Sequence, residues 1–112
     1  PAGTNLAAVK SPNVDILAHP GLIAPEEAAL AAKNDILLEL SARGGHCLCN
    51  GRVARLGLEA GASLLVNSDT HAPENLLTQE LQRMVAEGAG LSNAEVEKAL
   101  RINPEALLKR VR

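Results

Sequence analysis

Three short apolar runs stand out along the chain, at residues 14–18, 36–40 and 63–67. Each is about as long as a typical strand, and each is nearly continuous in hydrophobicity. Continuous apolar strands are typical of parallel sheets, in which both faces of a strand are buried. The pattern therefore predicts three buried, parallel strands.

Helical patterns lie between and after these runs. Proline suits a first helical turn and acidic side chains suit its positive end, so Pro25-Glu26-Glu27 predicts a helix start. A second helix is predicted over residues 52–60, ended by Gly61. A third is predicted to begin at Pro73. Its i, i+4, i+7, i+8 spacing is that of an amphipathic helix, with a stripe at Leu77, Leu81, Met84 and Val85.

The last part of the chain predicts two more helices. Ser92 followed by Glu95 matches a capping box, and Asn103 is a second predicted cap directly before Pro104. The buried stripe of the last helix is assigned to Leu107, Leu108 and Val111, and a short helix is expected at residues 5–10. Strands that alternate with helices predict an α/β fold with a parallel sheet joined by right-handed crossovers. Three strands form either a small open sheet or part of a barrel.

Composition narrows the class of protein. The 112 residues are 46% hydrophobic and 21% charged, which is typical of one soluble globular domain. With a net charge of -2 and scattered Lys and Arg, a nucleic-acid partner is not expected. The apolar runs are far shorter than the roughly 20 residues of a membrane helix, so no membrane partner is expected.

The two cysteines, Cys47 and Cys49, are one residue apart, a spacing poorly suited to a disulfide. Free thiols favour a reducing compartment, and the predicted location is the cytoplasm. Together with His46 they resemble half of a zinc site, but the second ligand pair of a structural site is missing.

Chemically reactive side chains gather where the apolar runs end. His19 follows the first run, Glu39 lies near the end of the second, and Asp69 and His71 follow the third. The carboxyl ends of parallel strands are where α/β barrels and open sheets hold their active sites. Asp69 and His71, two residues apart, would point to the same side of an extended segment. A carboxylate and imidazoles suit Zn²⁺, Mn²⁺ or Fe²⁺, with His19 as a third ligand.

Each of these residues also has a purely structural interpretation. His19 precedes Pro-Gly and fits a turn, while Asp69 could cap a helix beside a surface His71. An unpaired buried carboxylate is costly, so Glu39 could instead form a structural pair with Arg43. Alternatively, Arg43 in its glycine-flanked loop could bind a phosphate through its forked guanidinium.

Two motifs carry a family resemblance. Residues 15–21 (Asp-Ile-Leu-Ala-His-Pro-Gly) and 67–71 (Asn-Ser-Asp-Thr-His), about 50 residues apart, resemble later metal motifs of the PHP (polymerase and histidinol phosphatase) superfamily, in particular its histidinol-phosphatase-like proteins. The resemblance extends to Leu38-Glu39-Leu40 and to the helix at Asn103-Pro104. It implies a distorted (β/α)7 TIM-like barrel that holds two or three divalent ions and hydrolyses phosphoesters. It implies metal ligands at His19, Asp69 and His71, and Glu39 matches a position at the edge of the family's site. We therefore predict a catalytic centre at Asp69 and Glu39, with substrate binding by Arg43.

The family's opening His-x-His motif and first strands do not occur in this sequence. The resemblance therefore implies that residues 1–112 are the C-terminal portion of a PHP domain, which would act on a small phosphorylated substrate together with its missing N-terminal half. Two alternatives remain open at this stage. One is a non-catalytic, truncated PHP piece that works through self-association, because unpaired sheet edges favour it. The other is a small α/β binding module in which Asp69 and His71 merely cap a helix.

Overall fold

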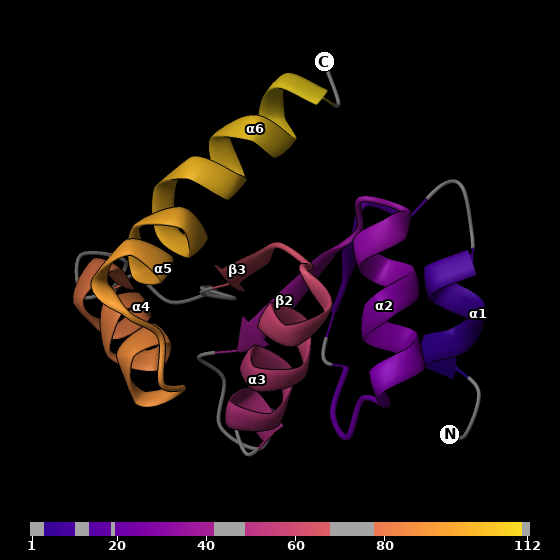
Figure 1. Ribbon diagram of the computed structural model, residues 1–112. Coiled ribbons are helices and arrows are strands. Elements are labelled where there is room, and N and C mark those ends of the chain that lie inside the picture. Colours follow the sequence, from indigo (N-terminus) through magenta and orange to yellow (C-terminus); the bar gives the residue numbers. More distant parts are fainter. Residues whose placement is uncertain (1–3, 11–13, 19, 42–48, 68–77, 111–112) are drawn as a thin grey trace.

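Three strands form one parallel sheet in the order β1-β2-β3. The computed structural model describes residues 4–10, 14–18, 20–41, 49–67 and 78–110, shown in colour in Figure 1. The elements in chain order are α1 (Thr4–Lys10), β1 (Ile16–Leu17), α2 (Pro25–Lys33), β2 (Leu37–Ser41), α3 (Asn50–Ala60), β3 (Leu64–Asn67), α4 (Thr78–Gly88), α5 (Asn93–Glu97), η3 (Lys98–Ile102) and α6 (Asn103–Arg110).

The predicted parallel α/β sheet is confirmed. Leu17 of β1 pairs with Leu38 of β2, and Ser41 at the end of β2 pairs with Asn67 at the end of β3. β1 is shorter than predicted, because its ladder to β2 holds at only two residues. The described residues form this three-stranded sheet, and they do not show the barrel of which the resemblance makes this chain the C-terminal part.

The central strand β2 is buried along its whole length, as a continuous apolar run predicts. Leu38 and Leu40 belong to the main hydrophobic core, together with Leu64 and Val66 of β3. Gly57 allows α3 to approach this face closely, since a Cβ there would lie 3.0 Å from side-chain atoms of both Leu38 and Leu64. By strand alternation, Leu37, Glu39 and Ser41 point to the opposite face.

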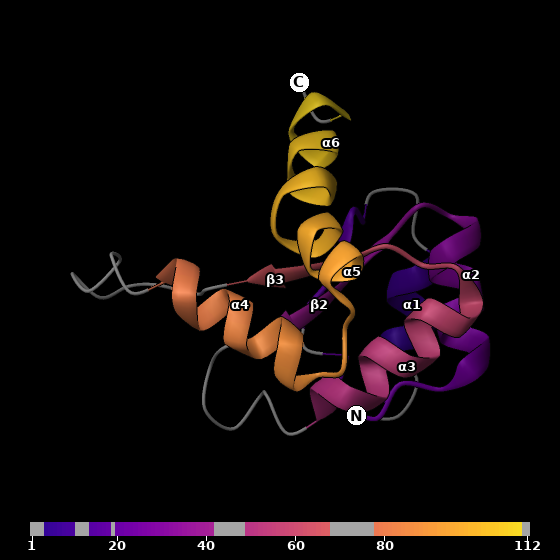
Figure 2. The same cartoon turned by 60° about the vertical axis from the view of Figure 1, so that its left-hand side comes forward.

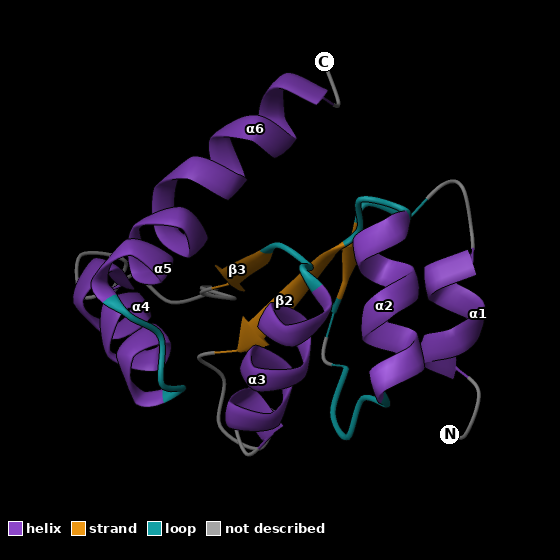
Figure 3. Ribbon diagram, viewed as in Figure 1, coloured by secondary structure: helices purple, strands orange, loops and turns teal. Residues whose placement is uncertain are grey.

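The helices are arranged around the sheet in chain order. Figures 1 and 3 show α1 and α2 together at one side, α3 in the middle, and α4 and α5 at the other side. Contacts agree with this arrangement, because α1 touches β1, α3 touches β2 and β3, and α4 touches β3. None of the helices in the described part of the chain has the length and apolar character needed to cross a membrane.

Local signals account for most helix ends. α2 begins at Pro25, and its carboxyl end is closed by Asn34 and by Asp35 in the left-handed region with φ 55°. The α3 helix begins at Asn50, two residues before its predicted start. It ends at Gly61, whose φ of 80° is a conformation that glycine adopts without steric cost. The capping box of α5 is present, with the Ser92 hydroxyl accepting from Glu95 N at 3.2 Å.

The prediction of a break before the last helix is wrong. From residue 93 to residue 110 the helix is continuous, and Asn103 has helical dihedral angles instead of those of an N-cap. Proline has no N–H, and its ring collides with the carbonyl four residues earlier in a regular α-helix. Here the turn before Pro104 widens into the π-helical η3, with Asn103 N bonded to Lys98 O, and the proline is accommodated without a break.

The outer surface of this continuous helix is exposed. No residue of α6 is buried, and Leu108 is 56% exposed, so the predicted buried stripe is wrong at Leu107 and Leu108. Val111 lies outside the described residues. Arg101 donates a hydrogen bond to Glu97, which raises the pKa of the Arg101 side chain above its ordinary value. An exposed pair of this kind adds little stability.

The α4 helix also differs from its predicted form. Its predicted start, Pro73, and the first stripe residue, Leu77, lie outside the described residues. Leu81 and Met84 are 43% and 68% exposed, whereas Val85 is packed against the core and Ala86 is buried among the described side chains of this helix. The amphipathic spacing is present, but the apolar side chains at 81 and 84 do not face the core.

Candidate functional site

The carboxyl ends of the three strands lie along one edge of the sheet, because the strands are parallel. The ends of β2 and β3 are level, since Ser41 pairs with Asn67. β1 ends lower, at the level of Leu38, three residues before the end of β2. At about 3.3 Å per residue this leaves a step of roughly 10 Å beside the upper part of β2.

The predicted site residues follow these strand ends at a constant interval. His19, Arg43 and Asp69 each come two residues after the last residue of β1, β2 and β3, which are Leu17, Ser41 and Asn67. His71 follows two residues after Asp69. All four predicted side chains lie outside the described residues. Within the part of the chain that is described, no group of three or more His, Cys, Asp or Glu is placed to hold a metal ion.

Glu39 is the predicted site residue that the structure describes. It lies in the middle of β2, opposite Leu65 of β3, and only 2% of it is exposed. By alternation its side chain points to the face away from the main core, and it does not lack an interaction partner. A carboxylate held inside the sheet two residues below the edge is consistent with either predicted role, structural or catalytic.

Asn50 fixes the end of β2 in a way that the sequence did not predict. Ser41 N donates to Asn50 Oδ1 at 3.0 Å, and Asn50 Nδ2 donates to Ser41 O at 2.9 Å. The ladder between β1 and β2 ends at Leu38, so β1 does not pair with Ser41. The primary amide of Asn50 makes the two hydrogen bonds that a longer neighbouring strand would make with Ser41. The sequence signal, an asparagine at the start of a helix, reads more simply as a cap.

Replacing Asn50 by alanine is expected to destabilise the chain by about 1–3 kcal/mol, because the Ser41 N–H and C=O both lose their partner. Urea unfolding followed by circular dichroism measures the change. Asn93 is also the first residue of a helix, but it is exposed. Asn93→Ala is therefore the matched control and should change stability by less than about 0.5 kcal/mol. Equal effects of the two substitutions would contradict the assigned role of Asn50.

Two further side chains hold the segment that follows β1. Asn5 Nδ2 donates to Pro20 O at 2.6 Å, and Arg52 Nε donates to Ile23 O at 2.9 Å. The segment is thereby tied to α1 on one side and to α3 on the other. At the carboxyl edge, side-chain hydrogen bonds thus hold the backbone of the segment after β1 and the end of β2.

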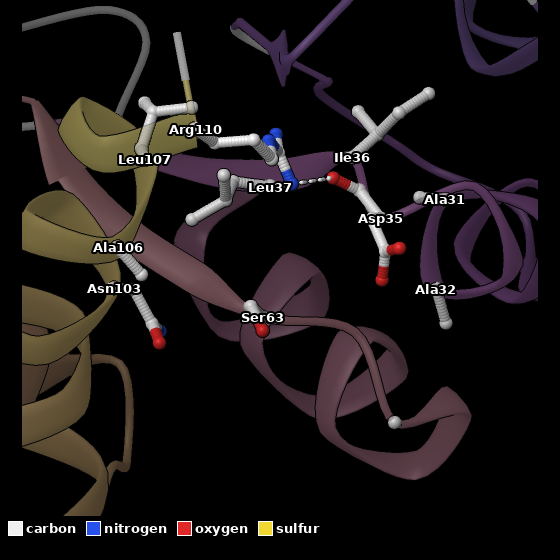
Figure 4. Close-up of a pocket in the computed structure, with 11 residues that line it drawn as sticks. Ala31, Ala32, Asp35, Ile36, Leu37, Ser63, Asn103, Ala106, Leu107 and Arg110 are labelled. Atoms are coloured by element: carbon white, nitrogen blue, oxygen red, sulfur yellow. Dashed lines mark hydrogen bonds between the residues drawn. The ribbon is translucent and has the colours of Figure 1, made fainter. Parts of the chain in front are cut away.

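A cavity of about 150 Å³ lies at the opposite, amino edge of the sheet, beneath α6. Figure 4 shows Arg110 reaching across it to the backbone carbonyl of Asp35, at 2.9 Å. The same guanidinium forms an ion pair with Asp15 at 3.2 Å. Ligand sites of parallel sheets lie at the carboxyl ends of strands, so this cavity is not the candidate site. Arg110 instead joins α6 to the starts of β1 and β2.

Comparison with known proteins finds three relatives of interest. An uncharacterised protein of Methanocaldococcus jannaschii is 48% identical over 108 residues, which cover 96% of this chain and 50% of that protein. Two proteins named probable phosphatases, from Shewanella frigidimarina and Shewanella halifaxensis, are 33% and 32% identical over 112 residues. These two alignments cover 89% of this chain and 44% and 43% of the relatives.

The chain thus spans half or less of the length of these relatives. No protein-family model matches the chain. No solved structure is significantly similar to it. What the comparisons say about function is that two of these relatives are named probable phosphatases.

Proposed function

We propose that this chain contributes the carboxyl-terminal part of a metal-dependent phosphoesterase. The observation that carries the proposal is the constant spacing at the carboxyl edge. His19, Arg43 and Asp69 each follow the end of a strand by two residues, and the three strands are neighbours in one parallel sheet. Three chemically different polar residues thereby follow, in the sequence, strand ends that lie at one edge of the sheet, the edge where such folds carry out their chemistry.

The donor set suits a borderline divalent cation such as Zn²⁺, Mn²⁺ or Fe²⁺. His19 and His71 offer imidazole nitrogens, and Asp69 offers a carboxylate that can bridge two ions. When bound, such an ion supplies Lewis acidity to a phosphoryl oxygen and makes water a better nucleophile at neutral pH. By family resemblance the complete site holds two or three ions.

Other residues of the chain would handle the substrate, a small phosphorylated molecule. Arg43 would bind two phosphate oxygens through its forked guanidinium. Glu39, buried in β2 below the edge, would hold or move a proton near the site. The two relatives named probable phosphatases support hydrolysis of a phosphate ester as the reaction class.

The test uses both the chain and a chimera in which it replaces the matching segment of the M. jannaschii relative. Phosphate release from p-nitrophenyl phosphate is measured with and without added Mn²⁺ or Zn²⁺, and metal affinity is measured by isothermal titration calorimetry. We expect metal-stimulated hydrolysis by the chimera. If neither form bound metal or released phosphate, the proposal would be wrong, and a small α/β binding module would fit better.

A further inference from the structure

The outer edge of β3 is the side that faces away from β2. Ser63 O, just before β3, accepts a hydrogen bond from Leu38 N of β2 at 2.9 Å. Backbone groups of successive residues in a strand point to opposite sides, so the carbonyls of Leu64 and Val66 point away from β2. In the described sheet β3 is a terminal strand, and no other strand pairs with it on that side.

Both outward carbonyls are nevertheless occupied. Asn103 Nδ2 donates to Leu64 O at 2.7 Å, and Gln82 Nε2 donates to Val66 O at 3.4 Å. The two donors come from different parts of the chain, one from the start of α6 and the other from α4. Both are primary amides, the side-chain groups closest in chemistry to a peptide N–H. The two amide nitrogens lie where the backbone N–H groups of a fourth strand would donate hydrogen bonds.

The helices that carry these amides are packed against β3. Both α4 and α6 contact the strand, as does η3 between α5 and α6, and Figure 2 shows α4 running close beside it. Asn103 follows the π-helical turn directly, so the turn that accommodates Pro104 also sets where this amide lies. Ala86 of α4 and Ala99 of η3 are buried in the same core as Leu64. The amides are therefore held by packed helices.

We propose that Asn103 and Gln82 close the outer edge of β3 against strand addition, so that a second copy of the chain cannot pair there. An open edge presents unpaired N–H and C=O groups that attract another strand, and covering it removes that template. This inference does not depend on the proposed phosphoesterase activity.

The test opens the edge by substitution. In the double variant Gln82→Ala/Asn103→Ala, the carbonyls of Leu64 and Val66 lose their side-chain donors. We expect its apparent mass, measured by light scattering after size exclusion, to rise at least two-fold with increasing protein concentration, while that of the unsubstituted chain stays constant. Hydrogen–deuterium exchange should show protection appearing at residues 64–67 as the mass rises.

Two controls separate edge opening from general loss of stability. Asn34 Nδ2 donates to Val9 O at 2.6 Å, a bond of the same kind away from β3, and Asn34→Ala should not associate. The variant Gln82→Glu/Asn103→Asp removes the donors but puts negative charge on the edge, which opposes strand pairing, so it should remain monomeric. If the double alanine variant does not fold, as judged by circular dichroism, Gln82→Ala alone is used.

A constant mass for a folded alanine variant would overturn the proposal. Association of Asn34→Ala to the same extent would overturn it as well, because the edge would then not be the cause. Concentration-dependent protection at residues 64–67 in the unsubstituted chain would show that the edge is open to begin with.

Discussion

Asp69→Asn is expected to lower metal-stimulated phosphate release by about 10³-fold in the chimera with the M. jannaschii relative. The amide keeps the size of the carboxylate but loses its charge, and an uncharged amide oxygen is a poor ligand for Zn²⁺ or Mn²⁺. Metal ions contribute several kcal/mol of charge stabilisation to such reactions, and each 1.36 kcal/mol corresponds to a factor of ten in rate. Initial rates with saturating Mn²⁺ measure the loss, and calorimetry measures the accompanying fall in metal affinity.

Asp35→Asn provides the matched control. Asp35 is an exposed aspartate at the amino edge of the sheet, and its positive φ of 55° is one that asparagine tolerates well. The substitution removes the same charge and should leave both rate and metal affinity within about two-fold of the unsubstituted protein, as for surface changes generally. Equal losses in the two variants, or an Asp69→Asn variant with full metal-dependent activity, would contradict the metal-site assignment.

Leu38→Ala is expected to destabilise the chain by about 2–5 kcal/mol, the cost of emptying a fully buried leucine site. Leu38 is 0% exposed on the central strand, and a Cβ at Gly57 of α3 would lie 3.0 Å from its side chain. Small domains are stable by only about 5–15 kcal/mol, so this loss should lower the urea midpoint markedly. Chemical unfolding of the isolated chain followed by circular dichroism measures it.

Leu22→Ala tests whether the loss of stability expected for Leu38→Ala is due to the burial of that side chain. Leu22 has the same side chain but is 78% exposed, so its truncation should change stability by less than about 0.5 kcal/mol. A shift in the Leu22 variant as large as that in the Leu38 variant would mean that the core has been assigned to the wrong residues.

Elements with strong local signals were predicted well. The apolar runs correspond to β2 and β3, and the burial of β2 along its whole length agrees with its nearly continuous hydrophobicity. The starts or ends of helices at Pro25, Gly61 and Ser92 were predicted because each is determined by the backbone preference or capping chemistry of one residue.

Predictions failed where packing overrides the local signal. Asn103-Pro104 reads as a cap followed by a first helical turn, but packing on β3 keeps the helix continuous through a π-helical turn. The apolar spacing of α4 correctly predicts a helix, but it does not determine which of the helix's side chains pack against the rest of the fold. Met84 is therefore exposed, while the small Ala86 is buried.

The sequence by itself determined the α/β alternation, the three buried parallel strands and the positions of His19, Asp69 and His71 after apolar runs, because these depend on residues close together in the chain. Only the tertiary structure decided the order of the strands, with β2 at the centre of the sheet. It also decided that Asn50, Gln82 and Asn103 supply side-chain amides where strands are missing. Each of those bonds joins residues 9 to 39 positions apart, and no local pattern specifies which backbone carbonyl a distant amide will meet.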